Sequence, residues 1–299
     1  MTDLAAYLPA ELRGATITKI GAGMSGAGVY RVEAAHGAFV LKINEQPLKR
    51  EIVELAAQAG LAPRVIHVDA ERRALVSELV ADRGFMPWLM NPATRARAID
   101  ELGRTLRRVH ELPIPPGTTA FDPLDVLRKV QLGLGGLAVP VSATTAIERM
   151  LFEQPPPRER IALCHGDLNP SNLMFDGERV ILLDWDTAGP NDPMIDLAAV
   201  GVFCRFDDAS ACALLAAHDG APIDALPASY SYYCRLVATA IGAIFLFLAR
   251  RLGHAGSSAE ATRTFAQCYE AMRAGQLDLV TADGRWTFGL ALLAHSRAL

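Results

Sequence analysis

The sequence predicts an α+β protein of two lobes: a small antiparallel β-sheet with one main helix, followed by a larger, mostly helical lobe. Strand-like segments dominate the first 80 residues, whereas from about residue 90 the apolar residues recur with helical spacing. The chain has 299 residues, of which 51% are hydrophobic, so it can form a substantial core and global disorder is excluded. We expect the lobes to span residues 1–80 and 81–299, with a hinge near residues 80–87.

Five strands and one helix are expected in the smaller lobe. The strand-like segments are residues 15–20, 29–33, 38–43, 64–68 and 74–79. In the third segment, Phe39, Leu41 and Ile43 occupy alternate positions and therefore share one face. A helix is predicted between the third and fourth strands, because Pro47 suits a first helical turn and Gly60 suits a helix end.

The larger lobe begins with a helix marked by apolar residues spaced 3, 4 and 3 apart: Ile99, Leu102, Leu106 and Val109. Further helices are expected over residues 123–134, 142–153, 193–204, 208–217, 228–251 and 258–274. Short strands are expected at residues 160–164, 172–175 and 179–183, the last two joined by an Asp-Gly turn. The longest apolar run, residues 236–249, is shorter than a membrane span of ~18 residues and indicates a buried core helix.

Charge and cysteine content narrow the class of protein. The formal net charge is −4, whereas a nucleic-acid-binding domain is normally basic, so we expect no nucleic-acid partner. The five cysteines are scattered, odd in number and without a C-x-x-C spacing, which favours reduced thiols. The start of the sequence lacks the basic region of a signal peptide. We therefore expect a cytoplasmic protein that does not insert into membranes.

One stretch of the larger lobe carries residues suited to phosphoryl transfer. Asp167 lies in the sequence His-Gly-Asp-Leu-Asn-Pro-Ser-Asn, Asn172 follows five residues later, and Asp184 follows after twelve more. Transfer from a nucleotide requires a carboxylate that orients the acceptor hydroxyl and accepts its proton, and oxygen ligands that hold magnesium. Between residues 165 and 208 there are nine acidic and two basic residues, which also favours a bound cation. The alternative for each piece alone is a polar loop or a hairpin turn.

These motifs resemble those of the aminoglycoside phosphotransferase/choline kinase family, which has the two-lobed protein-kinase-like fold. Residues 165–172 resemble the catalytic loop of that family, residues 182–186 its metal-binding segment, and residues 192–198 the signature that follows. Asp186 stands where glutamate is commoner. The resemblance implies that Asp167 is the catalytic base, that Asn172 and Asp184 are magnesium ligands, and that Asp196 braces the catalytic loop.

A glycine-rich segment in the smaller lobe is the expected nucleotide loop. Residues 21–26 read G-x-G-x-x-G, a motif that also occurs in dinucleotide-binding Rossmann domains. In a Rossmann domain the glycines open a helix, whereas here they lead into a strand, which is the kinase arrangement. Backbone amides would then lie over the phosphates at Gly23, Met24, Ser25 and Gly26. The alternative is a plain hairpin turn.

Three further groups complete the expected nucleotide site. Lys42 lies on the third strand, where a lysine would contact the α- and β-phosphates and pair with a helix glutamate. By resemblance that glutamate is Glu51, with Glu54 as the alternative. The alternative interpretation of Lys42 is a surface lysine without a role in nucleotide binding. Ser77 and Leu79 resemble the linker between the lobes, whose backbone would bind the adenine. The expected cofactors are ATP, with GTP as an alternative donor, and Mg²⁺.

The acceptor is expected to be a hydroxyl of a small molecule. Residues 220–299 contain seven arginines, no lysine and five acidic residues, a balance unsuited to a polycationic aminoglycoside. Residues 191–194 resemble the choline kinase branch, so a choline- or ethanolamine-like amino alcohol is favoured over an aminoglycoside or another metabolite. The candidate rings for binding the cation are Tyr230, Tyr233, Phe247 and Trp286.

Two other classes of protein fit the sequence less well than a small-molecule kinase does. A protein kinase is disfavoured because too few residues separate Asp184 from Asp192 for an activation segment. A non-catalytic nucleotide-binding scaffold would usually lack one of the four residues Lys42, Asp167, Asn172 and Asp184, and all four are present.

Overall fold

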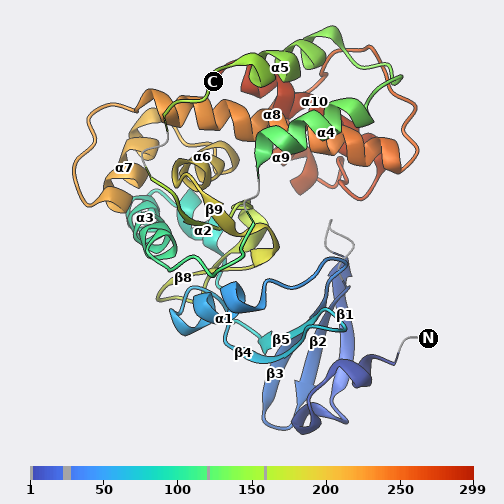
Figure 1. Ribbon diagram of the computed structural model, residues 1–299, viewed down its shortest axis with the longest axis vertical. Helices are drawn as coiled ribbons and strands as arrows, with labels where there is room; N and C mark the ends of the chain where they lie inside the picture. Colours follow the sequence, from blue (N-terminus) through green and yellow to red (C-terminus); the bar gives the residue numbers. More distant parts are fainter. Residues whose placement is uncertain (1–2, 23–27, 120–121, 158–159) are drawn as a thin grey trace.

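The computed structural model places a β-sheet at one end of the molecule and a lobe of helices at the other (Figure 1). It describes residues 3–22, 28–119, 122–157 and 160–299. The five strands are antiparallel, in the order β1-β2-β3-β5-β4. Their bounds are β1 (Thr16–Ala22), β2 (Gly28–Ala34), β3 (Gly37–Ile43), β4 (Val65–Asp69) and β5 (Ala74–Glu78). The predicted α+β class and the predicted small antiparallel sheet are confirmed.

One face of the sheet forms its own small core. Phe39 and Leu41 of β3 are buried, as their alternation predicted, and they pack with Val32 of β2 and Val76 of β5. Leu12 closes this core from the N-terminal 3₁₀ turns η1 (Leu4–Tyr7) and η2 (Ala10–Leu12). The opposite face of β3 is therefore left to present Lys42 toward the helical lobe.

The helix of the smaller lobe, α1 (Arg50–Gln58), starts later than expected. Pro47 lies before the helix instead of in its first turn. The orientation of α1 is set by its buried apolar residues, Ile52, Val53 and Ala56, which pack into the core of the helical lobe. Gly60 follows the helix with φ +68°, a left-handed conformation that terminates it as predicted.

The helical lobe contains the expected helices and two that the apolar pattern did not predict, α2 and α10. The helices are α2 (Phe85–Met90), α3 (Arg95–His110), α4 (Pro123–Gly133), α5 (Val141–Phe152), α6 (Met194–Phe203), α7 (Asp208–Asp219), α8 (Ala228–Arg251), α9 (Phe265–Arg273) and α10 (Ala282–Ser296). The helix expected from residue 258 begins only at Phe265, because Thr264 and Gln267 form a capping box there.

Helix α8 is the centre of this lobe. Among the described helices it is the one long and apolar enough to cross a membrane, with a mean hydropathy of 1.8 over its most apolar window. Most of that window, 72%, is buried inside the protein, where α8 packs against α10, α6 and α4. This burial agrees with the interpretation of the run as a core helix. A Cβ on Gly289 of α10 would lie 2.7 Å from the carbonyl oxygen of Gly242, so these glycines allow α8 and α10 to approach closely.

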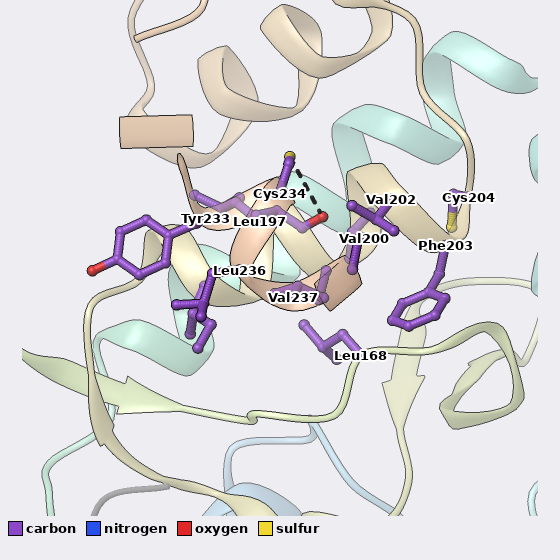
Figure 2. Packing of buried hydrophobic residues seen from close by; sticks show 14 of the residues in the cluster. Leu168, Leu197, Val200, Val202, Phe203, Cys204, Tyr233, Cys234, Leu236 and Val237 are labelled. Atoms are coloured by element: carbon purple, nitrogen blue, oxygen red, sulfur yellow. Dashed lines mark hydrogen bonds between the residues drawn. The ribbon is translucent and has the colours of Figure 1, made fainter. Parts of the chain in front are cut away.

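Two short two-stranded sheets connect this core to the candidate site. Strands β6 (Ala162–Cys164) and β9 (Gly189–Asn191) pair with each other, as do β7 (Leu173–Phe175) and β8 (Val180–Leu182). Strand β9 was not predicted, whereas the turn between β7 and β8 was. Leu168, in the loop after β6, packs onto α6 and α8 (Figure 2), so the loop with the polar motif rests directly on the core. The five cysteines are free, as expected.

Candidate active site

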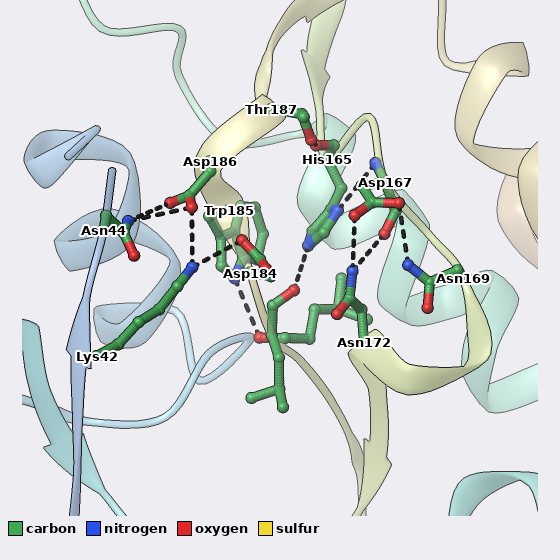
Figure 3. A network of polar contacts seen from close by, with 12 residues as sticks. Lys42, Asn44, His165, Asp167, Asn169, Asn172, Asp184, Trp185, Asp186 and Thr187 are labelled. Atoms are coloured by element: carbon green, nitrogen blue, oxygen red, sulfur yellow. Dashed lines mark hydrogen bonds and ion pairs between the residues drawn. The ribbon is translucent and has the colours of Figure 1, made fainter. Parts of the chain in front are cut away.

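The loop after β6 holds Asp167 by both of its carboxylate oxygens (Figure 3). The side-chain amide of Asn169 donates to Oδ1 over 3.0 Å, and that of Asn172 donates to Oδ2 over 3.1 Å. Asn172 also donates to the backbone carbonyl of Asp167 over 2.8 Å. These contacts fix the orientation of the Asp167 carboxylate and leave further lone pairs on each oxygen for a hydroxyl group.

A buried carboxylate, that of Asp196 on α6, braces the same loop. Its oxygens accept the backbone N–H groups of His165 over 2.7 Å and Gly166 over 2.8 Å, and His110 Nε2 lies 3.1 Å away. Burial by itself raises the pKa of Asp196, but the interactions with His110, His165 and Gly166 outweigh it and lower that pKa below its usual value. Asp196 is therefore charged, and it ties the start of the loop to α6 and α3.

The loop after β8 carries Asp184 in an unusual conformation. Its backbone has φ 62° and ψ 69°, a left-handed region that aspartate tolerates better than most residues with a side chain. The conformation is held on both sides: Leu183 N donates to Asn172 O over 2.9 Å, and Trp185 Nε1 donates to Leu182 O over 3.0 Å. Outliers of this kind persist at sites where the surroundings fix them.

Lys42 of β3 reaches across to this loop. Its Nζ donates to Asp184 Oδ1 and to Asp186 Oδ2, both over 2.8 Å. Burial lowers the pKa of Lys42, but the two carboxylates outweigh burial and raise it above its usual value. Burial raises the pKa of Asp184, yet Lys42 brings it below the ordinary range; burial and the charge of Asp184 leave the pKa of Asp186 raised. Asp184 is thus the more strongly ionised of the two carboxyl groups.

The expected pairing of Lys42 with Glu51 is wrong for this structure. Among the described residues, the ionic partners of Lys42 are Asp184 and Asp186. Glu51 lies exposed in the first turn of α1, because Ile52 and the following apolar residues turn the opposite side of that helix to the core. The alternative, Glu54, bonds instead to Arg50, with 2.8 Å between Nε and Oε1.

Two residues of the site escaped the sequence reasoning. The buried side chain of Asn44 donates to both oxygens of Asp186 over 2.9 and 3.0 Å, and Lys49 Nζ donates to the carbonyl of Ala188 over 2.6 Å. Burial lowers the pKa of Lys49. Asn44 was predictable, because it directly follows β3 and stands two residues after Lys42, so the strand directs both side chains to the same face. Lys49 had no such signal, since it precedes α1 in an irregular segment.

Of the other residues predicted to bind the nucleotide, some lie outside the described ranges and two lie within them. Gly23, Met24, Ser25 and Gly26 lie outside the described residues, but the strands that flank them are β1 and β2, paired antiparallel up to Ala22 and Gly28. A Rossmann arrangement, which needs a helix after the glycines, is therefore ruled out here. Ser77 lies on β5 opposite Val40. The N–H of Leu79 donates to Ala38 O over 3.1 Å, so this amide is already used.

The oxygen donors at the site suit a magnesium ion. Asp184, Asp186 and Asn172 provide carboxylate and amide oxygens, the hard ligands that Mg²⁺ takes in proteins. In the part of the chain that the structure describes, Oδ1 of Asn44 is buried beside them without a hydrogen-bond partner. A buried polar atom without a partner is costly, so a ligand or water that bonds to it would be stabilised.

A small cavity of about 20 Å³ lies beside Asp167. It is lined by parts of the loop after β6 and of α4, α6 and α8: Pro123, Gly166, Asp167, Leu168, Ile195, Ala199, Phe203, Val237, Ala240 and Ile241. Its lining therefore contains one carboxylate and one aromatic ring. The rings suggested by the sequence lie elsewhere among the described residues: Trp286 stacks on His254, for example, and Phe247 packs over Gly133. A cavity of this volume holds about one water molecule.

The sequence match to a curated protein is short, whereas the structural matches cover most of the chain. It is 40% identical to protein LicA of Haemophilus influenzae over 37 residues, which is 12% of this chain and 14% of LicA. The match therefore spans a small fraction of that curated relative.

Solved structures match nearly the whole chain at low identity. A choline/ethanolamine kinase family protein from Mesorhizobium loti superposes with a TM-score of 0.64 and 21% identity, covering 99% of this chain and 97% of that one. Choline kinase LicA from Streptococcus pneumoniae gives 0.62 and 17%, covering 94% and 93%. A spectinomycin phosphotransferase, solved with ADP and spectinomycin, gives 0.61 and 11%, covering 95% and 93%. These likenesses show a shared fold.

The family is shown by a match to the sequence itself. The profile of the phosphotransferase enzyme family covers residues 16–233, which is well over half of the chain. The matched region runs from β1 through the loop after β6 to the first part of α8, and it includes Lys42, Asp167, Asn172 and Asp184. The resemblance inferred from the motifs is thereby confirmed, and the chain belongs to the phosphotransferase enzyme family.

Proposed function

We propose that this protein is a kinase that uses ATP and Mg²⁺ to phosphorylate a hydroxyl group of a small molecule. The observation that carries the proposal is one polar network built from β3 and two loops of the helical lobe. Lys42 bonds to Asp184, the backbone of Leu183 bonds to that of Asn172, and Asn172 bonds to Asp167. These are the groups that phosphoryl transfer requires, and they come from distant parts of the sequence.

In this mechanism Asp167 orients the acceptor hydroxyl and accepts its proton. Burial raises the pKa of Asp167 and the nearby charge of Asp184 raises it further, although the amides of Asn169 and Asn172 oppose the rise. A carboxylate with a raised pKa is a stronger proton acceptor than an ordinary aspartate. The two side-chain amides hold it in one orientation, so little reorganisation is needed when the hydroxyl arrives.

The nucleotide phosphates would lie between Lys42 and the loop after β8. Mg²⁺ held by Asp184 and Asn172 would neutralise the charge of the phosphates, and the ammonium of Lys42 would bind their oxygens. The spectinomycin phosphotransferase with the same fold was solved with ADP, which supports a nucleotide donor. ATP is proposed as the donor and GTP is the alternative.

The acceptor we propose is a choline- or ethanolamine-like amino alcohol. The cavity beside Asp167 offers one carboxylate, the ring of Phe203 and otherwise apolar walls. A single weakly hydrated cation suits such walls, whereas a polycationic aminoglycoside would need several carboxylates. The names of two proteins that share the fold, the choline/ethanolamine kinase family protein and choline kinase LicA, support the same class. Because the cavity is so small, its walls must separate to admit the acceptor, or most of the acceptor must lie at its mouth.

An ADP-release assay with MgATP tests the function. The panel contains choline, ethanolamine, an aminoglycoside, thiamine and a sugar, and mass spectrometry verifies each phosphorylated product. Turnover of an amino alcohol supports the full proposal. Turnover of the aminoglycoside alone would overturn the acceptor and keep the kinase, while MgATP binding without turnover of any alcohol would favour the scaffold alternative.

Phe203 provides a sharper test of the acceptor. Phe203→Leu should raise KM for choline several-fold and leave KM for ATP unchanged, because one cation–π contact contributes about 0.5–2 kcal/mol. Phe245→Leu is the matched control, since that ring is equally buried in the helical lobe but does not line the cavity. Equal KM values for choline in the two variants would contradict a role for Phe203.

A further inference from the structure

A second and much larger cavity lies in the helical lobe. Its volume is about 660 Å³, within the range of sites that bind metabolite-sized ligands. It shares none of its described lining residues with the cavity beside Asp167. The two cavities nevertheless use the same helices: Phe203 at the end of α6 lines the small cavity, and its neighbours Val202 and Cys204 line the large one.

Two arginines give this second cavity its charge. The guanidinium of Arg95 lies 5.5 Å from the ring centroid of Phe206, and that of Arg205 lies 5.4 Å from the ring of Tyr269. Arg95 also donates to the neutral hydroxyl of Ser210 over 3.0 Å. Within the described ranges, neither guanidinium forms an ion pair with a carboxylate. Hydrogen bonds from Ser210 and the charge of Arg95 lower the pKa of the nearby carboxyl group of Asp207, but Arg95 and Asp207 form no ion pair, so both guanidinium groups keep donors for an anion.

The end of α6 places Arg205 at this cavity. Arg205 has φ +53°, a left-handed conformation in which its N–H donates to Val202 O over 3.2 Å and the N–H of Phe206 donates to Gly201 O over 2.9 Å. These two bonds are a common way to terminate a helix. They fix the backbone of Arg205, whose side chain lines the cavity.

Among the described side chains of the lining, the two arginines outnumber the single carboxylate of Asp208, and the carboxylate of the last residue, Leu299, also lies in the lining. Asp208 contributes one exposed carboxylate. Burial lowers the pKa of His295, so this imidazole is neutral at pH 7. Burial raises the pKa of Cys204 to about 12, so its thiol is neutral and unreactive. Much of the remaining wall is apolar or aromatic, including Leu226 and Phe265.

We propose that this cavity binds an organic anion, with its carboxylate or phosphate group paired to Arg95 and Arg205. The planar guanidinium group matches the geometry of both anions and forms paired, charge-assisted hydrogen bonds with them. The aromatic or aliphatic body of the ligand would lie against Leu226, Tyr230 and Phe265. This site is independent of the phosphoryl-transfer site and of its acceptor.

Calorimetric titrations of the full chain with three probes of one shape test the proposal. Phenylacetate and phenyl phosphate carry the two kinds of anion, and 2-phenylethanol is the neutral counterpart. We expect at least one acid to bind about tenfold or more tightly than the alcohol, because only the acids make charge-assisted bonds. The stronger of the two acids identifies the anionic group.

Variants assign the binding to this cavity. Arg95→Gln and Arg205→Gln should each weaken the acid about tenfold or more, whereas Arg97→Gln, an exposed neighbour on α3 outside the cavity, should not. Ala266→Trp keeps both arginines and places an indole in the cavity, so it should also remove binding even if an arginine variant folds poorly. Binding by the cavity variants at the affinity of the unmodified chain, or no acid binding at about 10 mM, would overturn the proposal.

Discussion

The ammonium nitrogen of Lys42 and a carboxylate oxygen of Asp184 lie 2.8 Å apart, although 142 positions separate the two residues in the chain. This contact joins β3 of the sheet to the loop after β8 in the helical lobe, and Asp186 accepts a second bond from the same ammonium. The three side chains are partly buried, so their attraction is screened less than that of a surface pair. The proposed binding of nucleotide and metal at these groups would therefore compete with an existing contact between the sheet and the helical lobe.

Replacing Lys42 with methionine should reduce kcat/KM for ATP about a hundredfold or more. The variant loses the cation that would bind the phosphate oxygens, and it leaves Asp184 and Asp186 to repel the nucleotide. Steady-state kinetics with a verified acceptor measures the effect. Lys129→Met, which changes an exposed lysine on α4, is the matched control and should behave like the unmodified protein. A Lys42→Met protein with a normal kcat/KM would remove Lys42 from the site.

Asp184→Ala should abolish most of the magnesium-dependent gain in nucleotide affinity. Asp184 is the more strongly ionised carboxyl group of the pair and is the proposed ligand, whereas Asp186 is already engaged by Asn44. Asp186→Ala should therefore have the smaller effect. Titrations of ATP with and without Mg²⁺ give the difference for each variant. The opposite ranking of the two variants would move the metal ligand to Asp186.

Asp196→Asn should lower the free energy of unfolding by about 2–4 kcal/mol, because a buried charged acceptor of several hydrogen bonds is lost. The substitution places an amide where His165 and Gly166 donate their backbone N–H groups. Urea denaturation measures the loss. Asp207→Asn, at the exposed N-cap of α7, is the control and should change stability little, because asparagine caps a helix as well as aspartate does. Equal losses in both variants would show that Asp196 does not brace the loop.

The stability of the protein should fall between pH 7 and pH 5 in part through His218. This side chain is buried against His110 and bonds to Asp219. Burial lowers the pKa of His218, although Asp219 opposes the effect. The folded state then takes up the proton at a lower pH than the unfolded state, so the stabilisation is complete above about pH 6.5 and is lost as the pH falls toward the folded-state pKa.

Urea denaturation at pH 7 and at pH 5 checks this pH dependence. His218→Gln should show a smaller fall in the free energy of unfolding between the two pH values than the unmodified chain. His36→Gln, at an exposed position near the β2–β3 turn, should show the same fall as the unmodified chain. An unchanged fall in His218→Gln would mean that another group titrates.

The sequence predicted the parts of the fold that depend on local pattern. Periodicity predicted that Phe39 and Leu41 share the buried face, and backbone preference predicted that Gly60 terminates α1. The structure has both features. The apolar pattern did not predict elements whose formation depends on tertiary contacts. Helix α10 carries glycines because it packs closely on α8, so its sequence looks like a poor helix when read alone.

The motifs of the site could be predicted from the sequence, but the contacts between its side chains could be predicted only in part. The sequence places Asp167, Asn172 and Asp184 on two loops, and the structure brings these loops together. The partner of Lys42 could not be read from the sequence, because it depends on which side of α1 faces the core and thus on contacts between the lobes. The rings predicted for the acceptor do not line the cavity beside Asp167, for a similar reason: helical spacing indicates that Tyr230 and Trp286 are buried, but not which cavity a buried ring lines.

In the proposed function, Asp167 accepts the proton of the acceptor hydroxyl during phosphoryl transfer. The most direct test is the rate at which Asp167→Asn forms phosphorylated product with an acceptor verified for the unmodified protein, with Asp176→Asn in the β7–β8 turn as control. We expect the rate to fall about a hundredfold or more in Asp167→Asn, with unchanged MgATP affinity, because the shape of the side chain is kept while the proton acceptor is lost. A rate close to that of the unmodified protein would contradict the claim.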